Sequence, residues 1–526
     1  MALISSIAAW FLKKRYHQIE LFLEYPINVQ NELFGDLILR AKDTTWGKQF
    51  NYGKIYSLKD FQRQVPISTY EDFSPYIERI RKGEHNLLWP TETRWFAKSS
   101  GTTDSKSKFI PVTDDSLNEC HYKGGKDMLA LYLNKNPESE FLSGKTIGVA
   151  GSASVSESNQ EFVGDLSAIL MSNLPLWAYF TKSPDLSITL MEDWARKVDL
   201  IVDNTLDVDI RAISGVPSWM LVILNKVIER SGKSTIQEVW PNFELIVHGG
   251  VNFTPYIDRF KSILDPSTNY QEVYNASEGF FAIQDSSAHD DLLLMLDYGI
   301  YYEFIPMSEY GKSNPIVLGL ADVELGKNYA LVISTNAGLW RYLIGDTVVF
   351  TSLTPYRIKI SGRTKSFINS VGEELIVDNA ENAIYHACQK TGAQIEEYTV
   401  APLFLSNGKS ITHEWFIEFN KEPDDLNFFS EVLDNTIKSL NSDYEAKRYR
   451  NMVLEYPIMH SVPKNTFIKW LQSKGKLGGQ NKVPRLSNNR DFVNELKEII
   501  ENNFKDYSFV YNDREKKVKV ESTEIK

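Results

Sequence analysis

Two periods of hydrophobic residues alternate along the chain and predict which segments are helices and which are strands. In the first 45 residues, apolar side chains such as Ile19, Leu23 and Leu37 recur at roughly helical spacing, so we expect helix there, interrupted near Pro26. From about 85 to 360, short β-rich runs alternate with helical stretches. That alternation is typical of an α/β protein with a sheet at its core.

The apolar runs also place individual elements of this α/β region. Lys145–Ala150 and Phe243–His248 are predicted strands, whereas Leu190–Asn204 and Pro217–Arg230 are predicted helices. The hydroxyl-rich run Ser152–Ser158 is expected to be an exposed loop. Four closely spaced runs then predict a meander or a small barrel: Tyr329–Ser334, Leu339–Leu343, Thr347–Phe350 and Arg357–Ile360.

After Gly362 the pattern changes to an α+β arrangement, with helix over 379–390, strands over 397–405 and 413–419, and helix over 427–440. We therefore expect a large N-terminal α/β domain, 1–361, and a smaller C-terminal α+β domain, 362–526. No low-complexity linker separates them, so Ser361–Lys365 is predicted to be a tight hinge.

Composition excludes several classes of protein. The 526 residues are 42% hydrophobic and 24% charged, which excludes a disordered chain, a collagen-like repeat and a small disulfide scaffold. The 69 acidic against 57 basic residues leave a net charge of −12, which argues against a nucleic-acid partner. We expect small-molecule partners and a monomer.

Cysteine content and hydropathy favour the cytoplasm. The two cysteines, Cys120 and Cys388, lie far apart and outside any CxxC pair, which excludes a disulfide framework and a thiolate zinc site. The apolar N-terminus Met1–Leu12 is too short to span a membrane and has no basic residue before it, so we expect it to begin an amphipathic helix. No other stretch is long and apolar enough to predict a membrane partner.

The first candidate site is the loop Lys98–Pro111, in which Ser99, Ser100, Thr102 and Thr103 surround one glycine. Its backbone N–H groups and hydroxyls could turn onto phosphate oxygens, with lysine charge close by. The alternative is a polar surface loop. A Walker motif is excluded because GxxxxGK[ST] is absent.

The second candidate follows a strand-like run that ends at Val273. Tyr274 could stack on a base, and Glu278 could offer a carboxylate to a hard divalent cation, with Ser277 beside it. The alternative is an ordinary turn with a solvated Glu278. Upstream, the turn His248–Gly250 would suit a close approach of backbone to adenine, although alone it is only a tight turn.

Two further candidates lie next to the predicted domain boundary. Asp346 follows a glycine and could accept two hydrogen bonds from ribose hydroxyls. Arg363 lies 17 positions later, so both side chains can approach one nucleotide while the chain swivels beside them. The alternatives are a common Gly-Asp turn and a β-turn with exposed charges.

In this order the four segments resemble the adenylate-forming superfamily of acyl-activating enzymes. Within it, Ser99–Thr103 with Lys108–Pro111, Tyr274–Glu278 and the late Lys482–Arg485 are similar to the auxin-responsive amido synthetases, the Gretchen Hagen family, as a bacterial-type member. The likeness begins at Pro66–Phe73 and covers most of the chain. It departs in two places: Asp104-Ser105 stands where many members have a glycine, and the hinge Gly362–Lys365 is closer to general acyl-activating enzymes than to the plant members.

The resemblance implies a role for each matching residue. Ser99, Ser100, Thr102 and Thr103 would hold the ATP phosphates. The other implied roles are adenine contact for Tyr274, a place by the nucleotide for Ser277, Mg²⁺ ligation for Glu278, ribose binding for Asp346, assistance at the hinge for Arg363, and contact with the α-phosphate or acyl carboxylate for Lys482. ATP and Mg²⁺ are thus the expected cofactors, with nucleotide and acid bound by 1–361 and motion in 362–526.

The activity implied by this resemblance is ATP-dependent activation of a carboxylic acid as an acyl-adenylate, followed by transfer of the acyl group to an amino acid. Two alternatives stay open. An acyl-CoA ligase would pass the acyl group to a thiol, and the fold does not separate the two enzymes. A non-catalytic ligand-binding relative is the alternative from another class, although Glu278, Asp346 and Lys482 are all present.

Overall fold

The computed structural model divides the chain into two compact units. The first comprises Met1–Ile344 and Val348–Lys359, and the second comprises Gly345–Thr347 and Ile360–Lys526. The structure describes residues 15–99, 108–151, 153–156, 161–179, 181–191, 193–250, 253, 256–286, 290–364, 367–368, 370, 373, 375–404, 411–448, 454–474, 483–487, 489–505 and 507–509.

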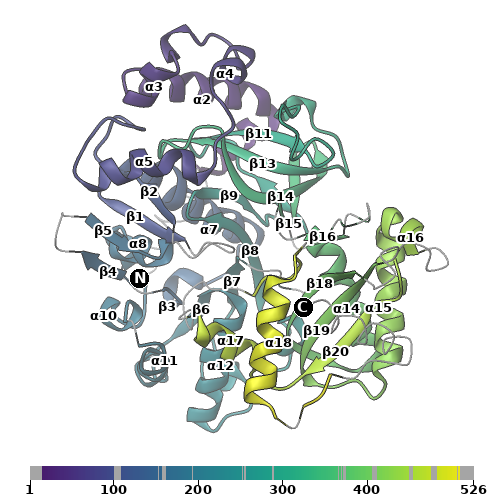
Figure 1. The fold of residues 1–526 in the computed structure, drawn as a ribbon. Coiled ribbons are helices and arrows are strands. Elements are labelled where there is room, and N and C mark those ends of the chain that lie inside the picture. The colour runs from purple at the N-terminus through teal and green to yellow at the C-terminus, as the bar shows by residue number, and fades with distance from the viewer. Residues whose placement is uncertain are drawn as a thin grey trace. The chain divides into compact units, whose positions relative to one another are not determined.

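Helices open the first unit, in the purple part of Figure 1: residues 15–24, α2 (Pro26–Ala41), α3 (Thr45–Gln49), α4 (Leu58–Gln64) and α5 (Tyr70–Arg81). Pro26 occupies the first turn of α2, where its missing N–H breaks no hydrogen bond. The predicted helical region with an interruption at Pro26 is therefore confirmed. The expected start of this helix, Met1–Leu12, lies outside the described residues.

A four-stranded sheet follows, in the order β2 (Lys108–Val112), β1 (Trp95–Ser99), β5 (Glu161–Gly164) and β4 (Ala153–Ser156). Strand β1 runs antiparallel to β2 and parallel to β5. The prediction of a loop over Ser152–Ser158 is wrong for Ala153–Ser156, because β4 pairs along its length with β5, and the rest of this run lies outside the described residues. A polar run can form an edge strand once a partner satisfies its backbone.

The large sheet has 11 strands. Their order is β12 (Leu318–Gly319), β11 (Ile300–Pro306), β13 (Asn328–Thr335), β14 (Tyr342–Leu353), β15 (Tyr356–Arg363), β10 (Leu292–Leu294), β9 (Gly279–Ile283), β8 (Asn269–Ala276), β7 (Leu245–Gly249), β6 (Ile210–Gly215) and β3 (Lys145–Gly148). The predicted strand 347–350 and the last two residues of the predicted strand 339–343 belong to one strand, β14, whereas 339–341 precede it.

Four neighbouring strands of this sheet, β3, β6, β7 and β8, are parallel. Strand β8 then turns back into β9, which is antiparallel to it. The helices α11 (Trp194–Asp203), α12 (Pro217–Ser231) and α13 (Ile257–Lys261) contribute to the apolar core beside the parallel strands. The helix after β2 is α6 (Asp114–Ser116), which continues through a π-helical turn, Leu117–His121, into α7 (Tyr122–Lys135).

Short helices complete the first unit: α8 (Leu166–Ser172), α9 (Leu176–Tyr179) and α10 (Leu186–Thr189). Within the residues that the structure describes, no helix is long and apolar enough to cross a membrane.

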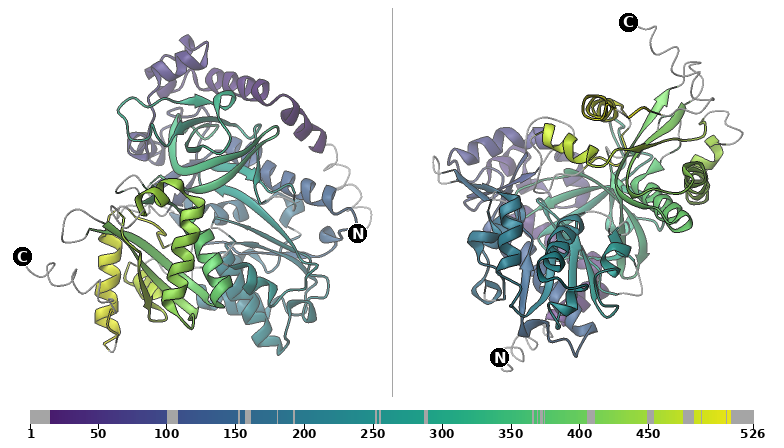
Figure 2. Two further views of the ribbon diagram at one scale, coloured as in Figure 1. Left: turned by 90° about the vertical axis from the view of Figure 1, so that its right-hand side faces the viewer. Right: turned by 90° about the horizontal axis from the view of Figure 1, so that it is seen from below.

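The second unit contains the small hairpin β16 (Phe367–Ile368) and β17 (Leu375–Ile376), and a three-stranded sheet in the order β18 (Gln394–Phe404), β19 (Ile411–Lys421) and β20 (Ile458–Val462). Its helices are α14 (Val377–Thr391), α15 (Leu426–Leu440), α16 (Ser442–Arg448), α17 (Thr466–Ser473) and α18 (Asp491–Asn503). The left view of Figure 2 shows the yellow helix and the green helices on opposite sides of these strands.

Alternating side chains of β19 explain this three-layer arrangement. Trp415 and Ile417 belong to the core that contains residues of α14 and α15, whereas Phe416, between them, belongs to the core that contains residues of α17 and α18. Because neighbouring side chains of a strand point to opposite faces, the sheet is covered on both sides. The predicted α/β fold with a smaller α+β part is confirmed.

Candidate functional site

The candidate residues of the first unit lie where parallel strands end. In open α/β sheets, ligands bind outside the carboxyl ends of the strands. Strand β7 ends at Gly249 and is paired with β8, with Gly249 opposite Val273 (Figure 1). The turn His248–Gly250 and the hairpin Tyr274–Glu278 are therefore neighbours at one edge of the sheet.

The turn after β7 has room only for glycine. A Cβ added to Gly249 would lie 2.3 Å from the carbonyl oxygen of Val273, and Gly250 has a φ of +80°. The backbone of β8 therefore fills the space that a side chain at Gly249 would need, and the positive φ of Gly250 also favours glycine. The neighbouring His248 is buried, and burial lowers its pKa to about 3, so its ring is neutral near pH 7.

Tyr274, Ser277 and Glu278 share one hairpin. Tyr274 is 5% exposed near the end of β8, and its ring centroid lies 4.7 Å from that of Phe281. Ser277 and Glu278 form the two-residue turn between Ala276 and Gly279, and both are partly exposed. The hairpin thus places one carboxylate at the carboxyl edge, two residues after the last paired residue of β8 and next to the glycine turn.

The sequence-based interpretation did not include Lys197, which binds backbone carbonyl groups at the same edge of the sheet. Lys197 is 2% exposed on α11, and its Nζ donates to the carbonyl oxygens of Ala150 (3.1 Å) and Gly151 (3.4 Å). Those two residues follow the carboxyl end of β3. Burial lowers the pKa of Lys197, and the nearby Asp165 opposes that shift. A lysine within the mostly apolar run of α11 was the available signal.

The hydroxyl-rich loop begins and ends in paired strands. Ser99 is the last residue of β1 and pairs with Lys108, the first residue of β2. The hydroxyl of Tyr70, on α5, accepts a hydrogen bond from the N–H of Phe109 at 2.9 Å. The two ends of the loop are therefore held together, and α5 binds the second one. Ser100, Thr102, Thr103 and the departure at Asp104 lie outside the described residues, as does Lys482.

Asp346 and Arg363 contact each other in the second unit. The Nε of Arg363 donates to Oδ1 of Asp346 at 2.8 Å. Further hydrogen bonds join the same segments. The N–H of Thr364 donates to the carbonyl oxygen of Gly345 at 2.7 Å, and Ser361 Oγ donates to Thr347 Oγ1 at 2.9 Å. The structure therefore confirms neither role, but it brings these two predicted residues together.

The donor set fits a magnesium ion held mainly by a nucleotide. The described residues contain no group of three or more His, Cys, Asp and Glu side chains that could hold a metal ion by themselves. Mg²⁺ is usually bound by one or two carboxylates together with substrate phosphates and water. Glu278 offers one such carboxylate, so the hairpin is suited to this kind of ion and not to a metal cage built by protein alone.

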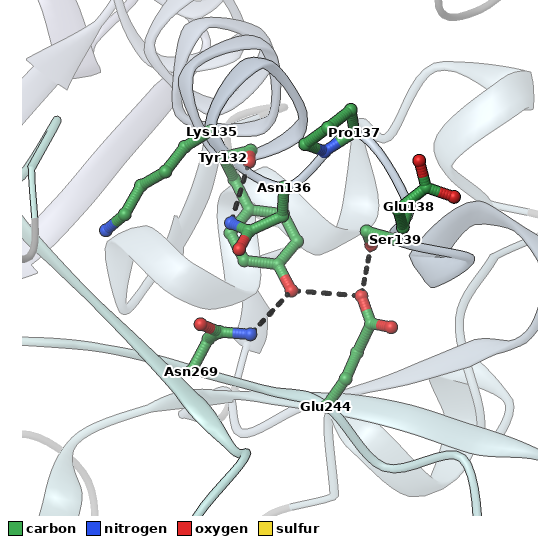
Figure 3. A pocket seen from close by; sticks show the side chains of 8 residues that line it. All are labelled: Tyr132, Lys135, Asn136, Pro137, Glu138, Ser139, Glu244 and Asn269. Carbon is green, nitrogen blue, oxygen red and sulfur yellow. Dashed lines mark hydrogen bonds between the residues drawn. The ribbon is translucent and has the colours of Figure 1, made fainter.

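A pocket of about 350 Å³ lies at the opposite, amino edge of the parallel strands, near Glu244 before β7 and Asn269 at the start of β8 (Figure 3). Tyr132 Oη donates to Glu244 Oε1 at 3.0 Å, and Ser139 Oγ donates to the same oxygen. Asn269 Nδ2 donates to Tyr132 Oη at 3.3 Å. Because these polar groups bind one another, we do not assign the reaction to this pocket.

Known proteins match this chain over most of its length. Models of the GH3 family match three parts of the chain: its N-terminal domain matches 15–268, its central domain 293–363 and its C-terminal domain 378–491. The indole-3-acetic acid-amido synthetase GH3.4 of Arabidopsis thaliana is 23% identical over 547 aligned positions, which cover 89% of this chain and 90% of the relative. The 4-substituted benzoates-glutamate ligase GH3.12 of the same plant is 25% identical and covers 62% of this chain and 66% of the relative.

Solved structures share the fold. The GH3.15 acyl acid amido synthetase matches with a TM-score of 0.71 at 18% identity, covering 90% of this chain and 93% of that protein. A 2-hydroxyisobutyryl-CoA ligase in its postadenylation state matches with a TM-score of 0.58 at 13% identity, covering 90% and 91%. At these identities the likeness shows that the fold is shared.

Proposed function

Because the chain belongs to the GH3 family, we propose that it uses ATP to join a small carboxylic acid to the amino group of an amino acid. The family expected from the sequence is confirmed by these matches. The amino-acid acceptor is supported by the names of the relatives, several of which are acid-amido synthetases and one of which is a glutamate ligase.

The chemistry requires two steps at one site. A carboxylate is a poor acyl donor because its leaving group would be oxide. The acid therefore attacks the α-phosphorus of ATP, which releases pyrophosphate and gives an acyl-adenylate. The amine then attacks the acyl carbonyl, the C–O bond to phosphate breaks, AMP leaves and the amine loses a proton. Charge on the α-phosphate during the first step needs a nearby cation, which Mg²⁺ and a lysine can supply.

The observation that carries this proposal is the position of Glu278. Its hairpin follows the last parallel strand and lies beside a turn in which only glycine fits. A turn without side chains next to a single carboxylate suits a nucleotide base and its magnesium ion.

We assign the phosphates to Ser99, Ser100, Thr102 and Thr103. Tyr274 flanks the adenine, Ser277 lies by the nucleotide, and Glu278 binds Mg²⁺. Asp346 binds the ribose, Arg363 assists at the hinge, and Lys482 contacts the α-phosphate or the acyl carboxylate. Residues 362–526 move between the two steps, since one site has to serve two geometries. Because neither cysteine forms a disulfide bond, we further propose a cytoplasmic location.

Two measurements test the proposal. Acid-dependent exchange of labelled pyrophosphate into ATP is expected from an enzyme and not from a non-catalytic binding protein. Mass spectrometry of the product, with either an amino acid or coenzyme A as the acceptor, then separates an amido synthetase from an acyl-CoA ligase. A panel of small aromatic and aliphatic acids with the 20 amino acids should give an amide. A thioester as the sole product would refute amide formation.

A further inference from the structure

The Cys120 thiol binds the backbone of a distant strand. It lies in the π-helical turn Leu117–His121 and is 1% exposed. The N–H of Phe280 donates to Cys120 Sγ at 3.1 Å, and Sγ can donate to the carbonyl oxygen of Phe280 at 3.9 Å. A π-helical turn changes the direction of side chains in a helix and often marks a functional region.

Phe280 pairs with Asn275 of β8 on one side, but on the other side it lies beyond the part of β9 that pairs with β10. The paired residues are Ala282 and Ile283. A buried backbone group without a partner is costly, so the thiol takes the place of a neighbouring strand for both polar groups of Phe280. Burial raises the pKa of the Cys120 thiol to about 12, so it stays protonated near pH 7 and can donate.

The same helix also fixes the ring of Phe280. One turn after Cys120, a Cβ added to Gly124 would lie 2.6 Å from Cγ of that ring. The ring therefore lies directly against the helix backbone, and Phe280 is 6% exposed. Two positions spaced by one helical turn thus hold the backbone and the side chain of one residue.

We propose that Cys120 is a positioning residue for Glu278, acting through Phe280. Phe280 is two residues after Glu278, and only Ala276 and Gly279 pair between it and the turn, with a register irregularity after Tyr274. The thiol is therefore a fixed point close to the end of an irregular hairpin. This inference rests on the proposed role of Glu278 as a Mg²⁺ ligand. Partners that orient a metal ligand typically change metal affinity by about 10- to 100-fold when they are removed.

The test compares Cys120→Ala with Cys120→Ser and with Leu131→Ala, a control that removes buried apolar atoms from the same helix. The Mg²⁺ concentration for half-maximal pyrophosphate exchange should rise about tenfold in Cys120→Ala. It should stay close to wild type in Cys120→Ser, which keeps a donor and an acceptor. Leu131→Ala should lower stability without changing this concentration.

Hydrogen exchange gives a second readout that does not depend on activity. The peptide 275–283 should exchange faster in Cys120→Ala and at the wild-type rate in Leu131→Ala. If Cys120→Ala does not fold, Cys120→Val fills the space while removing both bonds, and the same results are expected.

Two outcomes would overturn the inference. Unchanged exchange of the peptide in Cys120→Ala would show that the thiol does not hold Phe280. Faster exchange with a wild-type Mg²⁺ dependence would show that the held residue does not position Glu278. If the wild-type protein itself shows no acid-dependent exchange of pyrophosphate, the proposed function fails, and that result is recognised because it does not depend on residue 120.

Discussion

Arg363 donates a hydrogen bond from Nε to Oδ1 of Asp346 across 2.8 Å, although the two residues lie on different strands. The Asp346 side chain is only 11% exposed, whereas that of Arg363 is 46% exposed. The arginine therefore fixes the orientation of a largely buried carboxylate. An oriented carboxylate binds hydroxyl groups at a smaller loss of conformational entropy than a freely rotating one.

From this contact we expect Asp346→Asn to weaken ATP binding. Hydrogen bonds to charged groups contribute about 1.5 to 3 kcal/mol, so the KM for ATP in pyrophosphate exchange should rise by about tenfold or more. Arg363→Lys should have a smaller effect, because lysine keeps the charge while losing the planar fork. An unchanged KM in Asp346→Asn would refute the ribose assignment.

Two adjacent glycines of α7 should respond oppositely to alanine. Gly124→Ala places a methyl group against the Phe280 ring, and overpacking of this kind costs about 1 to 3 kcal/mol of unfolding free energy. Gly125 has no atom within 4 Å of an added Cβ, so Gly125→Ala should stabilise the helix by up to about 1 kcal/mol. Urea denaturation of both variants checks this, and equal effects would contradict it.

Acid should destabilise the first unit through His121. Burial lowers its pKa from 6.5 to about 4, so the unfolded chain takes up a proton first as the pH falls below 6.5. The contribution of His121 to the free energy of unfolding is therefore fully present above pH 6.5. It is lost progressively as the pH falls to about 4. The loss is on the order of 3 kcal/mol.

The measurement is the difference in unfolding free energy between wild type and His121→Asn at several pH values. Taking a difference removes the opposing contribution of Glu272, whose pKa burial raises to about 7. The wild-type advantage should shrink between pH 6.5 and 4. Replacing the exposed His17 by Asn serves as the control, and a parallel pair of curves for wild type and His121→Asn would contradict the expectation.

Breaking the buried pair between Glu303 and Arg341 should be strongly destabilising. Arg341 donates to both carboxylate oxygens at 2.9 and 3.0 Å and also to the carbonyl oxygen of Val65 at 2.7 Å. Glu303→Gln leaves the buried guanidinium without its counter-charge, which typically costs about 3 to 5 kcal/mol. Glu324→Gln breaks an exposed pair with Lys327 and should change stability by less than about 1 kcal/mol. Thermal unfolding of the two variants makes the comparison.

The elements with strong periodic patterns were predictable. Predicted helices over 379–390 and 427–440 correspond to α14 and α15, because their apolar faces repeat at helical spacing. The prediction of two strands in place of β14 was wrong, because a glycine at position 345 indicated a turn. In the structure Gly345 has a φ of +92° and yet stays within the strand, and the carbonyl group of this glycine accepts a bond from Thr364. The continuation of the strand through Gly345 becomes visible only with its partner Thr364 in place.

Candidate residues that are neighbours in the sequence could be placed in one element, but contacts between distant residues could not be predicted. Tyr274, Ser277 and Glu278 are close in sequence, so their shared hairpin follows from the strand pattern. Cys120 and Phe280 are 160 positions apart, and their contact depends on how a helix packs on a sheet. Local patterns carry no information about such packing.

The second unit takes Gly345–Thr347 from the middle of a strand whose other residues belong to the first unit. A chimera that joins two relatives at a single point near residue 360 would therefore combine Arg363 and Thr364 from one parent with Gly345 and Asp346 from the other. The hydrogen bonds between these two segments would then join residues of different parents. An exchange of C-terminal units between relatives therefore has to take β14 and β15 from the same parent, or use parents that share the same residues at Gly345–Thr347.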